Sequence, residues 1–291
     1  MKPVDKRDKV IEVTDLYVSF KADIGKPIPA LTGVDLSVRR GEIHGVVGES
    51  GCGKSVTARS ILRILGDRAM IKRGSIQYYR TAQEQPVEIT ELETDSPELR
   101  AVRGNDISMI FQEPMTSFSP VYTIGNQIQE AVQLHQGLDK KEARQKVIDM
   151  LKRVGMPRAE TRVDQYPHEL SGGMRQRAMI AMALSCNPTL LIADEPTTAL
   201  DVTIQAQILE LMKDLQAEFG MSILLITHDM GVIAEMAETV SVMYLGKVVE
   251  VGPVDEVFYD PKHPYTEALL QSMPALDQPR SDMLVQIKGS V

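Results

Sequence analysis

Residues 48–55 read Gly48-Glu49-Ser50-Gly51-Cys52-Gly53-Lys54-Ser55 and match the pattern GxxxxGK[ST]. They follow the strand-like segment 42–47 and precede an expected helix over 56–65. Glycines let the backbone curl so that successive N–H groups point inward, and the following helix adds its positive N-terminal end. The pattern therefore predicts an anion site for a polyphosphate, with Lys54 bridging the β- and γ-phosphates and Ser55 ligating Mg²⁺.

An apolar run, 190–193, ends in the carboxylates Asp194 and Glu195. Asp194 at the tip of a buried strand is expected to hold Mg²⁺ through water, and Glu195 to accept a proton from an attacking water. Paired acids after a strand are common in loops. The pair indicates a nucleotide-hydrolysing site because the phosphate loop lies upstream of it.

The composition is that of an ordinary globular protein. The chain has 291 residues, with 43% hydrophobic residues and a net charge of −8 from 32 Lys and Arg against 40 Asp and Glu. These values exclude a disordered tail, a collagen and a disulfide mini-protein. The length allows one large or two small domains. The negative charge argues against a general nucleic-acid binder, which usually carries a basic excess.

Neither a membrane span nor a secretory signal is apparent in the sequence. No stretch approaches the roughly 18 apolar residues that a membrane helix needs, and residues 1–8 lack an apolar core, so folding in the cytosol is expected. Cys52 and Cys186 lie far apart without CxxC spacing. They argue against a disulfide framework or a zinc site.

Strand-like and helix-like segments alternate along the chain. Strands are expected at 10–13, 33–38, 42–47, 189–193, 222–227, 239–245 and 247–251, and helices at 56–65, 172–184, 203–219 and 230–237. Residues 81–98 look like a polar surface insertion, and 123–154 form a helical block. The alternation predicts a mostly parallel sheet covered on both faces.

The segment that selects the family is Leu170-Ser171-Gly172-Gly173-Met174-Arg175-Gln176-Arg177, at the start of a helix. It resembles the signature motif of the ATP-binding cassette (ABC) ATPases, in the LSGGM form common among peptide-type members. Ser171 and the amides of Gly172 and Gly173 would form a second anion site for a γ-phosphate. A helix cap by Ser171 is compatible with that role. The resemblance implies that ATP is sandwiched between two cassettes.

Further residues match the motif order of that family. Gln112 resembles the Q-loop glutamine that contacts Mg²⁺, Asp201 in 199–201 looks like the D-loop, and His228 is similar to the switch histidine that senses the γ-phosphate. Phe20 matches the aromatic residue that stacks on adenine. Tyr17 is the alternative, and strand alternation puts it on the opposite face from Phe20.

The resemblance implies an α/β fold, a P-loop NTPase (RecA-like) ABC ATPase core with an antiparallel β subdomain and an inserted helical subdomain. The ABC domain would span 1–269, with the helical part at about 121–172, and a C-terminal importer-type extension would span 253–291. The implied catalytic residues are Glu195, His228, Gln112 and Lys54, and the implied metal ligands are Ser55, Gln112 and Asp194. The implied nucleotide-binding residues are Phe20, Gly48, Glu49, Ser50, Gly51, Cys52, Gly53, Lys54, Ser55, Ser171, Gly172, Gly173 and Asp201.

Two segments indicate a narrower group. Both resemble motifs of the oligopeptide/dipeptide/nickel importers. The first is Phe111-Gln112-Glu113-Pro114-Met115-Thr116-Ser117, and the second is His263-Pro264-Tyr265-Thr266. For the second motif, the local pattern indicates only a helix that starts with proline. That group usually continues into a Cys-bearing tail, so the resemblance implies that the extension is cut or the tail is absent.

The expected function is that of an ATPase subunit, with ATP and Mg²⁺, that powers import of di- or oligopeptides. Its implied partners are a second ATPase subunit (a paralogue or a copy), two transmembrane permease subunits and an extracytoplasmic substrate-binding protein, with no nucleic acid. It would lie peripherally on the cytoplasmic face of the inner membrane. The alternatives are nickel, glutathione or oligosaccharide import, or a soluble ABC ATPase of DNA repair or translation. An ABC ATPase of DNA repair would need long coiled-coil insertions, which the short helical block cannot supply. A translation-type ABC protein normally carries two cassettes in one chain, and this sequence has one phosphate loop.

Cys52 gives a further expectation. It lies in the phosphate loop close to a helix N-terminus, which favours the thiolate. A thiol alkylator should then block ATP binding, and Mg·ATP should protect. The alternative is that Cys52 is a spacer of which only the backbone matters.

Overall fold

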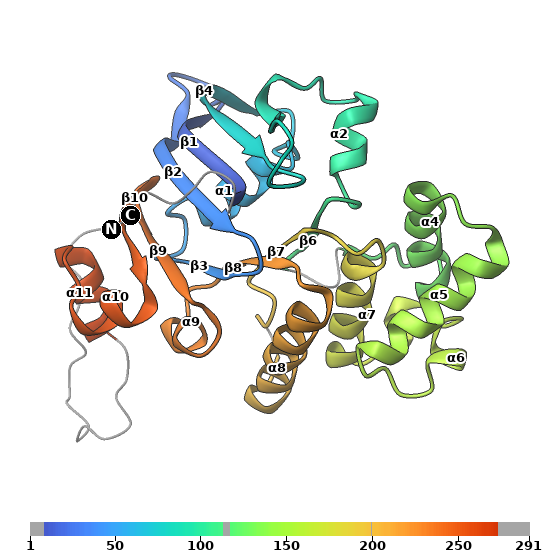
Figure 1. Cartoon of the computed structure of the whole chain (residues 1–291). Helices are drawn as coiled ribbons and strands as arrows, with labels where there is room; N and C mark the ends of the chain where they lie inside the picture. Colours follow the sequence, from blue (N-terminus) through green and yellow to red (C-terminus); the bar gives the residue numbers. More distant parts are fainter. Residues whose placement is uncertain (1–8, 113–116, 199, 273–291) are drawn as a thin grey trace. The chain divides into compact units, whose positions relative to one another are not determined.

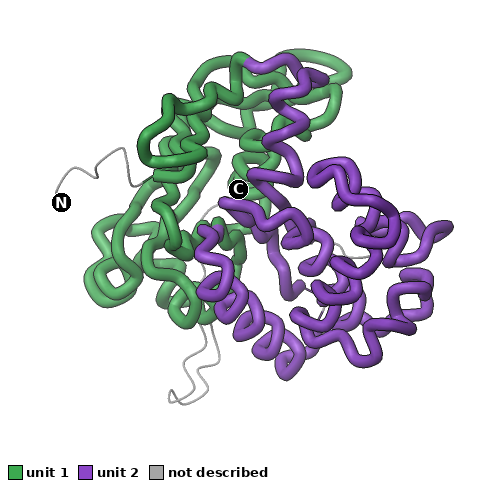
Figure 2. The backbone as a smooth tube through the Cα atoms, turned by 45° about the vertical axis from the view of Figure 1, so that its right-hand side comes forward, with its two compact units in different colours: residues 1–91, 224–291 green, residues 92–223 purple. Residues whose placement is uncertain are grey.

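The structure is a computed structural model that describes residues 9–112, 117–198 and 200–272. The chain forms two compact units, which Figure 2 shows in two colours. Unit 1 comprises residues 1–91 and 224–291, and unit 2 comprises residues 92–223. Among the described residues, no helix is both long enough and apolar enough to cross a membrane.

Unit 1 contains a four-stranded antiparallel sheet with the strand order β2-β1-β4-β5. Its strands are β1 (Lys9–Phe20), β2 (Ile28–Arg39), β4 (Ala69–Tyr78) and β5 (Val87–Glu88). β1 pairs with β2 along one edge and with β4 along the other (Figure 1). This sheet is the antiparallel part of the fold that the family resemblance implied.

A bulge interrupts the alternation of β1. Val13 and Leu16 are both buried although they are three residues apart, and their partners in β2, Leu36 and Val34, are two apart. Asp15 lies within the bulge with φ of 49°. One extra residue is inserted in this way, and both halves of β1 keep their apolar side chains on the buried face.

Each unit also contains strands of a second kind, in the order β10-β9-β3 in unit 1 and β7-β6 in unit 2, and the boundary between the units falls within β8 (Ser222–Ile226). In unit 1, β9 (Thr239–Tyr244) is parallel to β3 (Ile43–Val47) and antiparallel to β10 (Lys247–Pro253). In unit 2, β6 (Ile107–Ile110) is parallel to β7 (Leu190–Asp194). β3, β6, β7 and β8 are buried at every position, which is typical of parallel strands covered on both faces.

The described helices of unit 1 are α1 (Lys54–Ile61), α9 (Met230–Met236), α10 (Val254–Tyr259) and α11 (Pro264–Gln271), with a 3₁₀ turn, η2 (Ile89–Glu91). α1 is shorter than the expected helix over 56–65, because Arg63 adopts φ of 54° and the chain leaves the helix there. α10 packs against α9, β9 and β10.

The described helices of unit 2 are α2 (Pro97–Val102), α4 (Ile124–Gln136), α5 (Lys140–Arg153), α6 (Ala159–Arg162), α7 (Gly172–Leu184) and α8 (Val202–Phe219), with a 3₁₀ turn, η3 (Pro167–Glu169). α5 packs against α4, α6 and α7 (Figure 1). Asp139 forms a capping box that starts α5, and Gly137 ends α4 with φ of 65°. α2 begins inside the stretch 81–98, which the sequence had indicated as a plain insertion, because Ser96 caps it and Pro97 occupies its first turn.

Candidate nucleotide-binding site

The phosphate loop of unit 1 joins β3 to α1 and depends on its glycines. Gly48, Gly51 and Gly53 have φ of 151°, 83° and 112°. A Cβ at Gly48 would lie only 2.2 Å from the carbonyl oxygen of Met243 in β9. No side chain fits at position 48, since the loop packs directly against the backbone of the neighbouring strand.

The side chain of Lys54 folds back over this loop. Lys54 is 5% exposed, and its Nζ donates hydrogen bonds to the carbonyl oxygens of Gly48 (2.7 Å) and Glu49 (3.0 Å). The ammonium group is thereby held against the loop from the first turn of α1. The curled backbone, the glycines and this cation are the parts that a polyphosphate site requires.

Neighbouring elements of unit 1 also hold the phosphate loop in place. The N–H of Gly246, in the turn between β9 and β10, donates to the carbonyl of Cys52 (2.9 Å). The N–H of Glu49 donates to the hydroxyl oxygen of Tyr265 in α11 (3.0 Å). The sequence had given no sign of this second contact, which joins residues 216 positions apart.

The expectation that Cys52 carries a thiolate is wrong. The residue is 1% exposed, and burial raises the pKa of its thiol, while the nearby Lys54 ammonium acts in the opposite direction. Its sulfur packs inside the loop, where a Cβ on Gly48 would lie 2.8 Å from it. Proximity to a helix N-terminus does not decide the thiol's ionisation here, because the side chain is turned away from water.

We therefore expect both thiols to react slowly in the native chain at neutral pH. Cys186 is also buried (7% exposed), and burial raises the pKa of its thiol too. A chromogenic disulfide reagent should titrate two thiols per chain, the number in the sequence, only after unfolding. Rapid modification of one native thiol, prevented by Mg·ATP, would instead support an accessible thiolate at Cys52.

In unit 2, the acidic pair lies at the end of β7. Asp194 is fully buried, and Glu195 follows with φ of 48°, a conformation that costs of order 1–3 kcal/mol for a non-glycine residue. Glu195 Oε2 accepts hydrogen bonds from Gln112 Nε2 (3.1 Å) and Thr198 Oγ1 (2.9 Å). The structure thus brings together Gln112 and Glu195, which the family motifs had indicated separately. It adds Thr198, which sequence reasoning missed.

The signature segment in unit 2 starts α7. Ser171 is exposed and caps the helix, because its Oγ accepts the N–H of Met174 (3.3 Å). Gly172 is exposed, and Gly173 lies against α8, where an added Cβ would come within 3.0 Å of Ile204 Cγ2. Ser171 and Gly172 thus lie exposed at the start of α7, and the N-terminal end of a helix favours an anion.

One hydrogen bond links this segment to the loop after β7, and a second one caps the next helix of unit 2. Gln176 in α7 is buried, and its amide donates to the carbonyl of Pro196, directly after Glu195. Asp201 is exposed and caps α8 by accepting the N–H of Ile204 (3.0 Å). Ala199, in the expected D-loop, and residues 113–116 of the expected Q-loop segment lie outside the described residues.

The remaining predicted residues lie in unit 1. His228 is exposed and follows β8. Phe20 is half-buried at the end of β1, opposite Ile28 and Ala69 of the adjacent strands. Tyr17, the alternative aromatic residue, has the Arg73 guanidinium carbon 4.5 Å from its ring centroid. One face of the Tyr17 ring is therefore already covered.

The donor types fit the expected cofactors. Ser55, Gln112 and Asp194 offer a hydroxyl, an amide and a carboxylate oxygen, the hard ligands that Mg²⁺ prefers. Within the described residues, no group of three or more His, Cys, Asp and Glu side chains could hold a metal ion.

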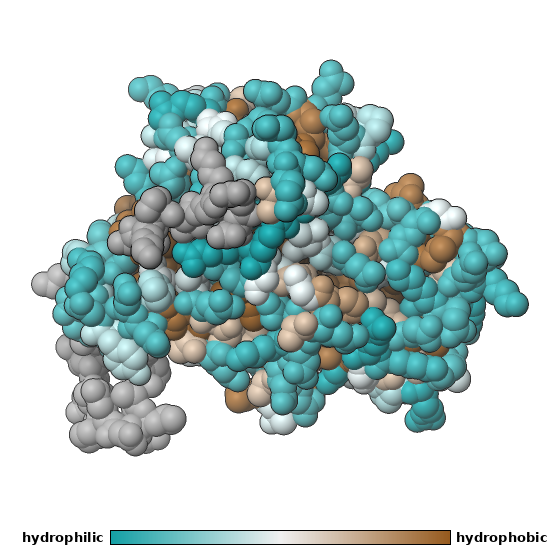
Figure 3. Space-filling view, in the orientation of Figure 1, coloured by the Kyte–Doolittle hydropathy of each residue, from teal (hydrophilic) through white to brown (hydrophobic). Residues whose placement is uncertain are grey.

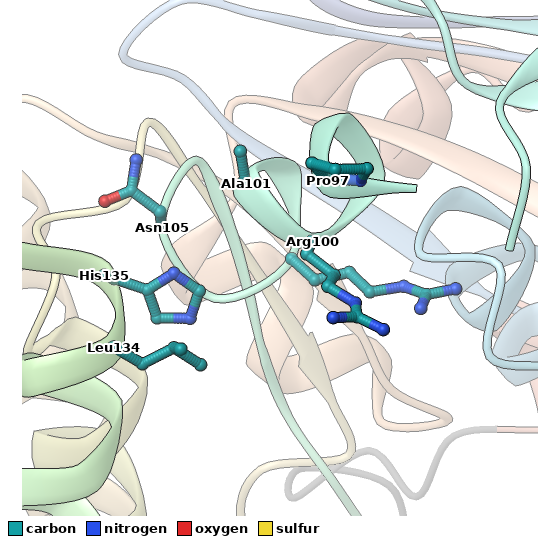
Figure 4. Close-up of a pocket in the computed structure, with 7 residues that line it drawn as sticks. Pro97, Arg100, Ala101, Asn105, Leu134 and His135 are labelled. Atoms are coloured by element: carbon teal, nitrogen blue, oxygen red, sulfur yellow. The ribbon is translucent and has the colours of Figure 1, made fainter. Parts of the chain in front are cut away.

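A separate cavity of about 520 Å³ lies in unit 2 between α2 and α4. Its lining residues are Pro97, Arg100, Ala101, Arg103, Asn105, Leu134 and His135, most of which Figure 4 labels. Leu134 is 77% exposed, and Figure 3 shows hydrophobic side chains at the surface in the region of α4. Burial lowers the pKa of His135, with Asp106 acting against it. None of the predicted nucleotide residues lines this cavity.

A glycine loop between a buried strand and a helix, together with an acidic pair at the tip of another buried strand, defines a P-loop nucleoside triphosphatase. The chain belongs to the ABC transporter family, because the family model described as "ABC transporter" matches residues 31–198. The model described as "Oligopeptide/dipeptide transporter, C-terminal region" matches residues 249–291. The family resemblance and the class of enzyme expected from the motifs, an ATP-binding ATPase coupled to transport, are confirmed.

Curated relatives match nearly the whole chain. A putative peptide import ATP-binding protein of Brucella ovis is 55% identical over 271 residues, which are 93% of this chain and 79% of the relative. The oligopeptide transport ATP-binding protein AppD of Bacillus subtilis is 55% identical over 283 residues, 97% of this chain and 83% of AppD. The glutathione import ATP-binding protein GsiA of Salmonella typhimurium is 50% identical over 281 residues, 97% of this chain and 44% of GsiA.

Solved structures share the fold. A dimeric structure of a post-hydrolysis state of the ATP-binding cassette MJ0796, bound to ADP and Pi, superposes with a TM-score of 0.72 at 27% identity. The match covers 84% of this chain and 98% of that chain. The expected fold class, an ABC ATPase core of mixed α/β type, is confirmed.

Proposed function

We propose that this chain is the ATP-hydrolysing subunit that powers import of di- or oligopeptides through an ABC transporter. The observation that carries the proposal is the 55% identity, over nearly the whole chain, to relatives named as peptide import and oligopeptide transport ATP-binding proteins. The match of residues 249–291 to the C-terminal region of oligopeptide/dipeptide transporters supports the same substrate class.

The phosphate loop supplies the nucleotide-binding half of the proposed chemistry. Backbone amides of the phosphate loop other than those of Glu49 and Cys52, together with the Lys54 ammonium, would bind the phosphates of ATP. Phe20 would stack on the adenine ring, and His228 would sense the γ-phosphate. The hydrogen bonds from Lys54 to the carbonyl oxygens of Gly48 and Glu49 support this role, because they hold the cation at the loop.

The acidic end of β7 supplies the hydrolytic half. Ser55, Gln112 and Asp194 would hold Mg²⁺, which neutralises phosphate charge when it is bound. Glu195 would accept the proton of the attacking water. The contact between Gln112 and Glu195 supports this division of roles. The Gln112 NH₂ group donates to the carboxylate, and the side chain also has a carbonyl oxygen, the type of ligand that Mg²⁺ prefers.

Ser171, Gly172, Gly173 and Asp201 would meet the nucleotide of a second ATPase subunit, a paralogue or a copy of this chain. The exposure of Ser171, Gly172 and Asp201, at the starts of α7 and α8, supports an intermolecular role. Residues 1–269 would then form the ABC domain and residues 253–291 its importer-type extension, of which 273–291 lie outside the described residues.

The remaining partners would be two permease subunits in the membrane and an extracytoplasmic substrate-binding protein, with the chain on the cytoplasmic face of the inner membrane. The helical segment at about 121–172 would transmit closure to the permease. Three exposed apolar side chains, Val121 (70%), Tyr122 (58%) and Leu134 (77%), support a protein-docking role for this segment.

Glutathione import is the second candidate, favoured by the 50% identity to a glutathione import ATP-binding protein. Substrate choice would rest with the binding protein and the permease, so the same ATPase chemistry serves either candidate. Nickel and oligosaccharides are further candidate substrates for the same class of transporter.

Reconstitution with the permease and binding subunits encoded beside this chain tests the function. We expect uptake of labelled di- and oligopeptides into proteoliposomes that contain ATP, and peptide-stimulated ATP hydrolysis. Glutathione, nickel and an oligosaccharide serve as the competing substrates. Uptake of only one of these would contradict peptide import, and co-purification with DNA or ribosomes instead of hydrophobic subunits would contradict transport.

A further inference from the structure

The motif His263-Pro264-Tyr265-Thr266 is fixed in place at the start of α11 in unit 1. His263 Nδ1 accepts the N–H of Tyr265 (3.1 Å), and Pro264 occupies the first turn. The Glu250 carboxylate in β10 accepts the N–H groups of Lys262 (2.7 Å) and His263 (3.1 Å). α11 therefore begins at a defined position against β10.

This start directs Tyr265 into the interior of unit 1. Tyr265 is 6% exposed, and its ring lies 4.3 Å, centroid to centroid, from the ring of Tyr244 at the end of β9. Its hydroxyl oxygen accepts the backbone N–H of Glu49 at 3.0 Å. Burial raises the pKa of Tyr265 to about 12, so the hydroxyl stays protonated and neutral in the physiological range.

Glu49 is consequently held from both sides of its backbone. Its N–H is bound by Tyr265, and its carbonyl oxygen accepts from Lys54 Nζ (3.0 Å) and from the N–H of Cys52 (3.3 Å). Lys54 and Cys52 belong to the phosphate loop itself, whereas Tyr265 belongs to the region matched by the oligopeptide/dipeptide transporter model. Tyr265 thus connects that C-terminal region to Glu49, near the start of the phosphate loop.

We propose that Tyr265 is a positioning residue for the phosphate loop, through which the C-terminal region promotes ATP binding. The inference rests on the proposed function and adds a determinant of ATP affinity to it. A hydrogen bond that fixes Glu49 reduces the ordering that the loop must undergo when it binds phosphate. The hydroxyl acts on the loop and touches no reacting atom, so it should affect ATP affinity and leave the chemical step unchanged.

The coupling must be reciprocal. If the contact of Tyr265 with the loop strengthens ATP binding, ATP binding stabilises the docking of α11 by the same factor. Amide hydrogen exchange in residues 265–271 should therefore slow when ATP is added to the Glu195→Gln variant, which would retain the nucleotide. A tyrosine that serves only to fill space would not transmit this protection.

The substitution Tyr265→Phe tests the proposal, because it removes the hydroxyl and keeps the ring beside Tyr244. We expect the Kd for Mg·ATP of the full chain to rise about two- to tenfold, the range for one lost hydrogen bond. The KM for ATP should rise by a similar factor, with kcat unchanged. The readouts are nucleotide titration and steady-state hydrolysis.

Tyr79→Phe is the matched control. Tyr79 is also 6% exposed in unit 1, and its hydroxyl has two possible acceptors in the antiparallel sheet, Glu12 (3.0 Å) and Gln77 (2.9 Å). Both variants lose one hydroxyl of a buried tyrosine and keep the ring, and thermal unfolding should show that both remain folded. Only Tyr265→Phe should change the ATP affinity.

The outcomes separate this inference from the proposed function. Normal affinity in Tyr265→Phe, or unchanged exchange of α11 on adding ATP, would overturn the positioning role. Tighter binding would overturn it as well, because the hydroxyl would then compete with phosphate for the Glu49 amide. If the unmodified chain binds no ATP, the proposed function itself fails.

Discussion

The variant Glu195→Gln should bind Mg·ATP as tightly as the unmodified chain and hydrolyse it at least about 10²-fold more slowly, the usual scale for loss of a general base. Glutamine has nearly the shape of glutamate, and its amide oxygen can still accept from Gln112 and Thr198, the two partners of Glu195 Oε2. The substitution therefore removes proton acceptance and keeps the geometry around the side chain.

The measurement is a pair of experiments, nucleotide titration for affinity and phosphate release for turnover. Glu210→Gln is the matched control, since Glu210 is an exposed glutamate of α8 in the same unit. That control should hydrolyse ATP at the normal rate. Near-normal hydrolysis by Glu195→Gln would show that another group accepts the proton, and a loss of affinity would show that the carboxylate serves binding.

The variant Lys54→Met should bind Mg·ATP about 10- to 100-fold more weakly, the range for loss of a hydrogen bond from a charged group. Methionine retains an unbranched apolar stem in a position that is 5% exposed, so packing is largely kept. Only the ammonium is lost, and with it the bonds to the carbonyls of Gly48 and Glu49.

Nucleotide titration measures this loss, and thermal unfolding checks that the loop survives. Lys247→Met is the control, because Lys247 is an exposed lysine of β10 in the same unit as the loop. Its affinity for ATP should not change. An unaltered affinity in Lys54→Met would remove Lys54 from the phosphate site.

Much of the fold followed from local patterns. Residues 48–55 predicted the loop between a strand and a helix, since positive φ angles need glycine wherever the loop turns. Nearly continuous apolar runs predicted β7 and β8, because a parallel strand is buried on both faces, and the strand-like segment 42–47 predicted β3. The helix cap at Ser171 could likewise be predicted, because it depends on a contact between residues only three positions apart, Ser171 and Met174.

Other features could not be obtained from local patterns. The bulge at Asp15 depends on register with β2, and the pairing of Gln112 with Glu195 joins residues 83 positions apart. Thr198 completes that group, yet a threonine after an acidic pair carries no distinctive signal. The ionisation of Cys52 was predicted wrongly, because a local argument from the helix N-terminus omits burial.

For this protein, the sequence by itself determined the class of chemistry. Its phosphate loop, acidic strand end and signature segment are short patterns whose function depends on backbone shape and on the order of residues. Only the tertiary structure decided how those parts are held. Tyr265 contacts Glu49, and burial raises the pKa of the Cys52 thiol, because folding packs distant segments together. Both hydrogen bonding and desolvation depend on what lies nearby in space.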